Sequence, residues 1–150
     1  MLAACGLVIV GVLAHVGLGR LVASPWTMPD LTLIGLATVA MARPERALLP
    51  IAVGVVAVLP VAGQHPLQVG MLYGAAGLLV RRAASGWELV PGWVPVALVA
   101  AIELGLIAWW LLMDGFAQLT IAGPALWRIA ATGACVPLAR AVVERLLRAR

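Results

Sequence analysis

The stretch from Met28 to Arg46, MPDLTLIGLATVAMARPER, decides the fold of this chain. Its uncharged core, Leu31 to Ala42, is only about 12 residues long and would cover about 18 Å as a helix. The hydrocarbon core of a bilayer is about 30 Å thick. The run is therefore either a soluble core helix or a membrane segment that gains length from its flanks.

Composition decides between these two alternatives. The chain is 64% hydrophobic and 11% charged, whereas about 25% of the residues in a soluble globular domain are charged. The ionisable residues are clustered, and the run from Met1 to Gly19 is interrupted only by His15. These features predict an all-α integral membrane protein in which residues 1–150 form a single membrane domain.

We expect a six-helix transmembrane bundle with short or proline-broken spans. The second span begins at Pro29 and Asp30, because proline at an early position and an acid near the positive end of the helix dipole both suit a helix start. The fourth span is expected to stop at Arg81 and Arg82. The predicted spans cover residues 2–23, 29–42, 47–62, 67–80, 93–113 and 121–143.

The arginines predict the topology. The chain has a net charge of +4, and its basic residues fall mostly in alternate loops and in the tail. Arg20 and Arg128 are assigned to the opposite side, so the positive-inside rule places both termini in the cytoplasm. We expect membrane lipids as partners and no nucleic acid, because no basic patch carries interleaved aromatics. The residues assigned to the cytoplasmic side are Arg43, Arg46, Arg81, Arg82, Arg140, Arg145, Arg148 and Arg150.

Glu103 lies near the middle of the fifth predicted span. An ionisable residue at that depth is costly and should face the bundle interior. Trp110 and Asp114 fall within about 20° of Glu103 around a helix, so the three form one stripe. The stripe is either a cavity wall or proton site, or Glu103 makes a purely structural hydrogen bond.

Small residues indicate two close helix contacts. His15 lies between Gly11 and Gly19, four residues from each, so it either pairs with Glu103 across such a contact or makes a purely structural hydrogen bond. A second set lies on one face of the fourth span and predicts a packing seam, with a substrate groove as the alternative. That set is Gly70, Gly74 and Gly77.

Motifs for catalysis are missing from the sequence. Cys5 and Cys135 have no metal-ligand spacing, and there is no nucleotide loop, hydrolase triad, haem motif or iron–sulfur motif. We therefore expect no catalytic residues, no metal and no cofactor, which argues against an enzyme.

Several short motifs resemble, in order, those of the MreD family of bacterial rod-shape membrane proteins. Pro29-Asp30-Leu31 resembles the family's entry to a short second span, and Arg43-Pro44 resembles the turn that follows it. The chain departs from the family at Val58-Leu59-Pro60, where an acid is usual, and at Gln68, where glycine is expected. The other matching positions are Gly54, His65-Pro66-Leu67, Leu72-Tyr73, Gly77 and Pro137.

The resemblance implies a fold similar to the substrate-binding subunits (S-components) of vitamin-uptake transporters. It also implies a non-enzymatic scaffold of the cell-elongation complex in the bacterial inner membrane, supporting peptidoglycan synthesis and cell shape. The implied partners are the single-span protein MreC, RodA with penicillin-binding protein 2, and the actin-like MreB, with Pro29 and Asp30 facing the outer side. The alternative is a small-molecule-binding transporter subunit or lipid carrier that uses the Glu103, Trp110 and Asp114 wall.

Overall fold

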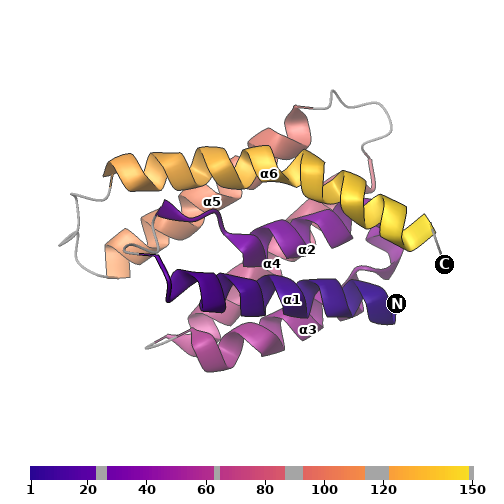
Figure 1. Cartoon of the computed structure of the whole chain (residues 1–150), viewed down its shortest axis with the longest axis horizontal. Helices are drawn as coiled ribbons and strands as arrows, with labels where there is room; N and C mark the ends of the chain where they lie inside the picture. Colours follow the sequence, from indigo (N-terminus) through magenta and orange to yellow (C-terminus); the bar gives the residue numbers. More distant parts are fainter. Residues whose placement is uncertain (23–26, 63–64, 87–92, 114–121, 149–150) are drawn as a thin grey trace.

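The chain is all-helical across the residues that the computed structural model describes, which are 1–22, 27–62, 65–86, 93–113 and 122–148. Figure 1 shows the arrangement of its helices. The prediction of an all-α fold is confirmed. Within the described residues there are six α-helices and two short 3₁₀ helices: α1 (Leu2–Gly19), α2 (Leu31–Ala42), η2 (Pro44–Arg46), α3 (Leu48–Val58), η3 (Leu59–Val61), α4 (Pro66–Ala84), α5 (Val94–Met113) and α6 (Ala122–Arg148).

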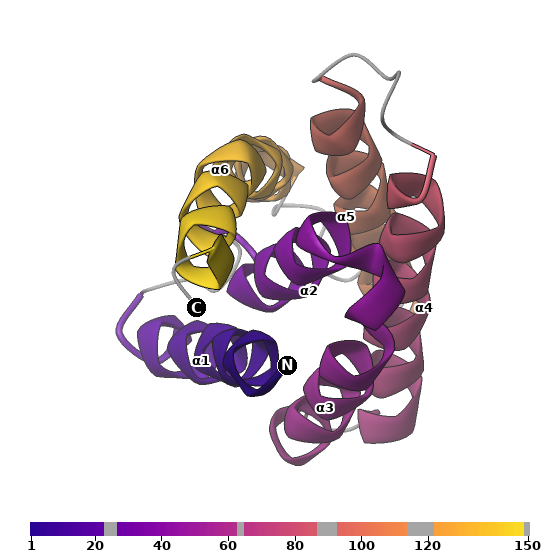
Figure 2. The ribbon, with the colours of Figure 1, turned by 90° about the vertical axis from the view of Figure 1, so that its right-hand side faces the viewer.

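The short helix α2 occupies the centre of the bundle. It packs against α1, α3, α4, α5 and α6, and the end-on view in Figure 2 shows it surrounded by them. Nine of its twelve residues are buried. A helix that neighbouring helices enclose does not need to match the bilayer thickness, because protein shields its ends from lipid. This explains how a run as short as Leu31–Ala42 fits a membrane protein.

Three of the described helices are long and apolar enough to cross a membrane: Leu2–Gly19, Val94–Met113 and Gly123–Leu146. Only 11% of the α1 segment and 22% of each of the other two is buried inside the protein. Their remaining apolar surface faces outward, as lipid-facing helices require. The membrane character is therefore supported by these three helices. Leu31–Ala42 and Leu48–Val61 are shorter apolar segments.

Two predicted boundaries near arginines are wrong. Helix α4 does not stop at Arg81 and Arg82 but continues to Ala84, and α6 runs past residue 143 to Arg148. Arginine is a good helix former, and its charge is favourable in the last turn, where the helix dipole is negative. Helix α1, by contrast, is shorter than predicted, because it ends at Gly19 rather than near residue 23.

Prolines set the form of the third helix. Helix α3 ends at Val58, and the tighter η3 follows it. Pro60 lies within η3 and has no N–H to continue the α-helical hydrogen bonding. The third span is therefore short and tightens at Pro60, but it remains one apolar helical segment, Leu48–Val61, and is not broken there. In α6, by contrast, Pro124 falls in the first turn, where a missing N–H costs little, and Pro137 lies inside the helix.

The start of α1 and the end of α6 lie at the same end of the bundle (Figure 1). The turn between α2 and α3 also lies there, because Met1 and Arg46 line one pocket. The end of α4 joins them, since Arg81 Nε donates a hydrogen bond of 2.7 Å to the Pro44 carbonyl. Successive helices therefore alternate in direction, at least from α1 to α4.

Glycines on α1 and on α4 were predicted to form two close helix contacts. The structure contains the α4 contact in full and the α1 contact in part. On α4, a Cβ added at Gly70 would lie 2.9 Å from Leu59, and one at Gly77 would lie 3.0 Å from Ile51. Gly74 also faces the third span, so the three α4 glycines form a seam against α3 and η3.

On α1 the two glycines differ. A Cβ at Gly11 would lie 2.9 Å from the Leu31 carbonyl oxygen, so the backbones of α1 and α2 meet at this position. At Gly19 nothing lies within 4 Å. The interpretation of Gly19 as a close-contact residue is wrong, because α1 has already passed α2 at its last residue.

Candidate functional site

Asp30 is the N-cap of α2 and the centre of a buried polar cluster. Its Oδ1 accepts a hydrogen bond of 2.9 Å from the Leu33 N–H, which would otherwise lack a helical partner. Aspartate is among the best N-cap residues, and its charge favours the positive end of the helix dipole. Asp30 therefore lies just outside the helix, one position before its first turn, and Pro29 precedes the helix.

The rest of Asp30 is held by two other helices. Its backbone N–H donates to Thr132 Oγ1 of α6 at 2.9 Å. Its Oδ2 accepts hydrogen bonds from the Tyr73 hydroxyl of α4 and, at 2.9 Å, from Arg128 Nη2 of α6. The side chain is 0% exposed, so three donors, the Leu33 N–H, the Tyr73 hydroxyl and Arg128 Nη2, replace the water that the carboxylate would otherwise bind. One residue thus joins the start of α2 to α4 and α6.

Arg128 extends this cluster to α5. Its Nε donates to Glu103 Oε1, while Nη2 reaches Asp30. The arginine side chain is 11% exposed and both carboxylates are 0% exposed. The planar guanidinium fork can hold two carboxylates at once, which a lysine ammonium cannot do with the same geometry. We call Asp30, Arg128, Glu103, Tyr73 and Thr132 the ionic cluster.

His15 borders the ionic cluster from α1. Its Nδ1 lies 3.8 Å from Asp30 Oδ1, too far for a hydrogen bond. Two buried polar atoms have no hydrogen-bond partner among the described residues, His15 Nδ1 and Glu103 Oε2. With Asp30 and Glu103 ionised, the ionic cluster holds two negative charges and one positive charge. The unpartnered atoms are the places where it could bind a further polar group.

The structure brings together three of the residues that the sequence singled out. Asp30, Glu103 and His15 all lie at or beside the ionic cluster. The nearest acid to His15 is Asp30, through the 3.8 Å approach, and not Glu103 as expected. Glu103 instead pairs with Arg128.

Trp110 belongs to a different group. It packs with Trp109 against a small buried apolar cluster of Val12, Val58 and Val69. The two tryptophan rings meet edge-on with centroids 5.1 Å apart. Trp110 is two turns along α5 from Glu103, so sharing a helix face does not place them at one site. Asp114 lies outside the described residues.

Arg128 is the site residue that sequence reasoning missed. The topology prediction counts it with Arg20 on the side opposite the basic loops, yet it lies inside α6 with little exposure. A signal was present, since Arg128 sits within an otherwise uncharged stretch from Asp114 to Arg140. Two acids in apolar spans also require a cation to compensate them. Tyr73 and Thr132 carried no distinguishing signal beyond their polar side chains.

Most other arginines lie away from the ionic cluster. Arg43 and Arg46 line the pocket at the end of the bundle where α1 starts, and Arg81 lies beside them through its bond to Pro44. Arg82 and Arg145 are exposed. The side chain of Arg148 is outside the described part.

The comparisons add no relative to this picture. The chain matches no protein-family model, and it is similar to no curated protein and no solved structure at a significant level.

Proposed function

We propose that this protein is a non-enzymatic membrane scaffold similar in role to MreD, acting in the bacterial cell-elongation complex of the cytoplasmic membrane. It would bind an MreC-like single-span protein and the RodA–penicillin-binding protein 2 synthase. On the cytoplasmic side it would contact MreB. The six helices would all cross the membrane, with both termini in the cytoplasm.

The observation that carries the proposal is the ionic cluster. Its three charged side chains bind one another and tie α2, α4, α5 and α6 into one unit. Charges that are used in this way fix helix positions rather than transform a substrate. A rigid bundle whose outer helices keep apolar surface is suited to docking other membrane helices.

Co-purification tests this proposal. The full chain, carrying an affinity tag, is isolated in mild detergent from the bacterium that encodes it, and bound proteins are identified by mass spectrometry. We expect a single-span protein with a periplasmic coiled coil, together with a peptidoglycan synthase pair. Rounded cells on depletion of the protein would agree. Recovery of neither partner, with normal rods on depletion, would contradict the proposal.

Asp30 does not offer a direct contact to such a partner, because it is 0% exposed. Asp30 would therefore act on a partner only indirectly, by holding the start of α2 in place. Pro29 is partly exposed and remains available. Substituting Asp30 should weaken partner recovery only as far as it unfolds the bundle.

A second candidate is a small-molecule-binding transporter subunit or lipid carrier. The observation in its favour is that Glu103 Oε2 and His15 Nδ1 are buried without a partner among the described residues. A ligand with a polar group would raise the melting temperature, and Glu103→Ala would remove that rise. A screen of vitamins and lipid precursors that leaves the melting temperature unchanged would argue against this candidate.

A further inference from the structure

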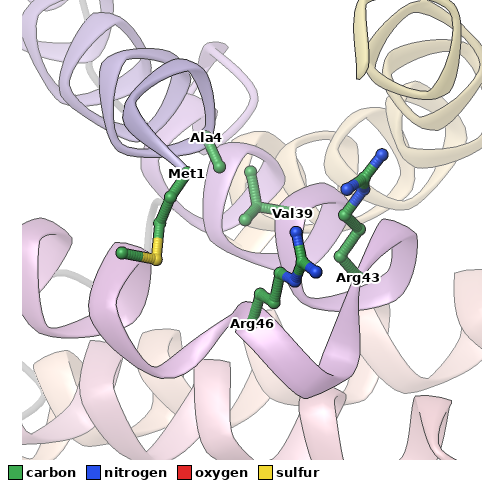
Figure 3. A pocket seen from close by; sticks show the side chains of 5 residues that line it. All are labelled: Met1, Ala4, Val39, Arg43 and Arg46. Atoms are coloured by element: carbon green, nitrogen blue, oxygen red, sulfur yellow. The ribbon is translucent and has the colours of Figure 1, made fainter. Parts of the chain in front are cut away.

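A pocket opens at the end of the bundle where the chain starts. Figure 3 shows it between the first turn of α1, the end of α2 and the η2 turn. Its cavity volume is about 30 Å³, and the space around it opens to the surroundings. It is separate from the ionic cluster, none of whose residues line it. The lining residues are Met1, Ala4, Val39, Arg43 and Arg46.

The lining combines an apolar floor with a cationic rim. Ala4 and Val39 are 9% and 2% exposed and close the inner side. Arg43 and Arg46 carry the rim, and Figure 3 shows both guanidinium groups directed away from the turn that bears them, to the same side. No acidic side chain is among the described lining residues. The pocket is therefore built for a group that is negative at one end and apolar at the other.

Arg46 is the rim residue with unused binding capacity. It is exposed, and its guanidinium forms neither a hydrogen bond nor an ion pair among the described residues, while its backbone N–H donates to the Arg43 carbonyl at 3.1 Å. The neighbouring Arg81 guanidinium, held at the Pro44 carbonyl, adds positive charge beside the turn. Guanidinium groups bind phosphate oxygens through paired N–H donors, and this geometry suits a phosphate monoester or diester.

The position of the pocket along the bundle points to a lipid. It lies at Met1, where the 18-residue apolar helix α1 begins. The end of a membrane-crossing apolar helix is at the level of the lipid phosphates, and basic pockets between helices at this level bind anionic headgroups. The apolar floor then lies on the side where the acyl chains continue.

We propose that Arg43 and Arg46 bind the phosphate of an anionic phospholipid at the mouth of this pocket, with its acyl chains along the exposed apolar surface of α1, where Leu2 is 89% exposed. Arg46 supplies the main contact and Arg43 a second one. This site is independent of the proposed scaffold function, since it would hold a lipid whichever proteins dock on the bundle.

The test measures lipid binding to the purified full-length chain in non-ionic detergent. Phosphatidylglycerol or phosphatidylcholine is titrated in, and bound lipid is counted by native mass spectrometry. The variants are Arg46→Gln, Arg46→Lys and, as the matched control, Arg82→Gln, which removes the same charge from an exposed α4 arginine outside the pocket. Circular dichroism melting shows whether each variant is folded.

We expect phosphatidylglycerol to bind more tightly than phosphatidylcholine. The Arg46→Gln variant should have an affinity for phosphatidylglycerol about tenfold lower than that of the unchanged protein. Arg46→Lys should lose less of this affinity, and Arg82→Gln should change it little. Equal loss from Arg46→Gln and Arg82→Gln would mean diffuse attraction and would overturn the site. Equal binding of the two lipids would overturn it as well.

Competition with inorganic phosphate tests whether the site is specific for a lipid. If the site serves a lipid, free phosphate should displace phosphatidylglycerol only weakly, because it lacks the acyl chains that would lie along the exposed apolar surface of α1. Displacement by phosphate at concentrations comparable to those of the lipid would show a site for a soluble anion and would overturn the assignment to phospholipid.

Discussion

Helices α1 and α2 have almost the same kind of sequence and opposite places in the bundle. Neither contains an acidic or basic residue apart from His15 in α1. Yet α1 buries three of its 18 residues, and α2 buries nine of its 12. In a lipid environment apolar content does not decide which helix is inside, because lipid is as apolar as leucine.

Polar and small residues make the difference. Asp30 caps the start of helix α2 and is bound by α4 and α6, and α2 carries the buried Thr32 and Thr38. Helix α1 touches α2 closely at Gly11 and approaches the ionic cluster only through His15. The inside position of α2 therefore depends on polar bonds at its start and on small residues in its neighbours.

The largest effect should come from Asp30→Ala. It removes the N-cap and one of the two carboxylates that bind the buried Arg128 guanidinium, so we expect a loss of about 3–5 kcal/mol in the free energy of unfolding. Denaturant unfolding in detergent micelles measures this. The control is Glu45→Ala, an exposed carboxylate in η2, which should change stability by less than about 0.5 kcal/mol. Similar stability of the two variants would show that the ionic cluster does not hold α2.

A pair of leucines tests the comparison of α1 with α2 directly. Leu36 of α2 is 0% exposed, whereas Leu13 of α1 is 64% exposed. Leu36→Ala leaves a cavity, and in lipid the transfer term is small but the lost packing remains, so we expect a loss of about 2 kcal/mol. Leu13→Ala should cost less than about 0.5 kcal/mol. Denaturant unfolding in micelles measures both losses. Equal losses in the two variants would mean that α1 is enclosed by other helices as α2 is.

The sequence allowed much of this architecture to be predicted, for identifiable reasons. Long uncharged runs predicted helices, and the isolated acid Glu103 marked the interior, because its cost in lipid requires partners. Asp30 was expected to face the outer side, yet it is buried. Boundaries at arginines failed, since α4 continues through Arg81 on favourable helix propensity. The sequence could not show which helix was central, because α1 and α2 have the same apolar character.

The ionic cluster was predictable only in part. A helical wheel places Trp110 on the side of Glu103 but ignores the distance of two turns between them. Arg128 was counted as a topology residue, although its apolar surroundings matched those of the two acids. A rule that pairs every intramembrane acid with the nearest intramembrane cation would have selected Arg128, but nothing in the linear order shows that residues 30, 73 and 128 meet.

The crossing of α1 over α2 can be broken at Gly11. In Gly11→Ala the new Cβ would lie 2.9 Å from the Leu31 carbonyl oxygen, a backbone atom that cannot rotate away. We expect a net loss of about 1.5 kcal/mol from the separation of the two helices. Gly19→Ala, where nothing lies within 4 Å, should instead be neutral or gain about 0.5 kcal/mol from helix propensity. Melting temperatures of the two variants should move in opposite directions, and a shift of the same sign in both would contradict this contact.

The smallest effect should come from Glu103→Gln. The amide oxygen can still accept the hydrogen bond from Arg128 Nε, and the change replaces the carboxyl group beside Arg128 with a neutral amide of nearly the same shape. A hydrogen bond between charged groups exceeds one to a neutral acceptor by about 1 kcal/mol, so we expect a loss of that size in the micelle assay. Glu103→Ala removes the acceptor altogether and should cost more. If Glu103→Gln destabilised the protein as much as Asp30→Ala does, the cluster would depend on both charges equally, and α5 would hold α2 as firmly as α4 and α6 do.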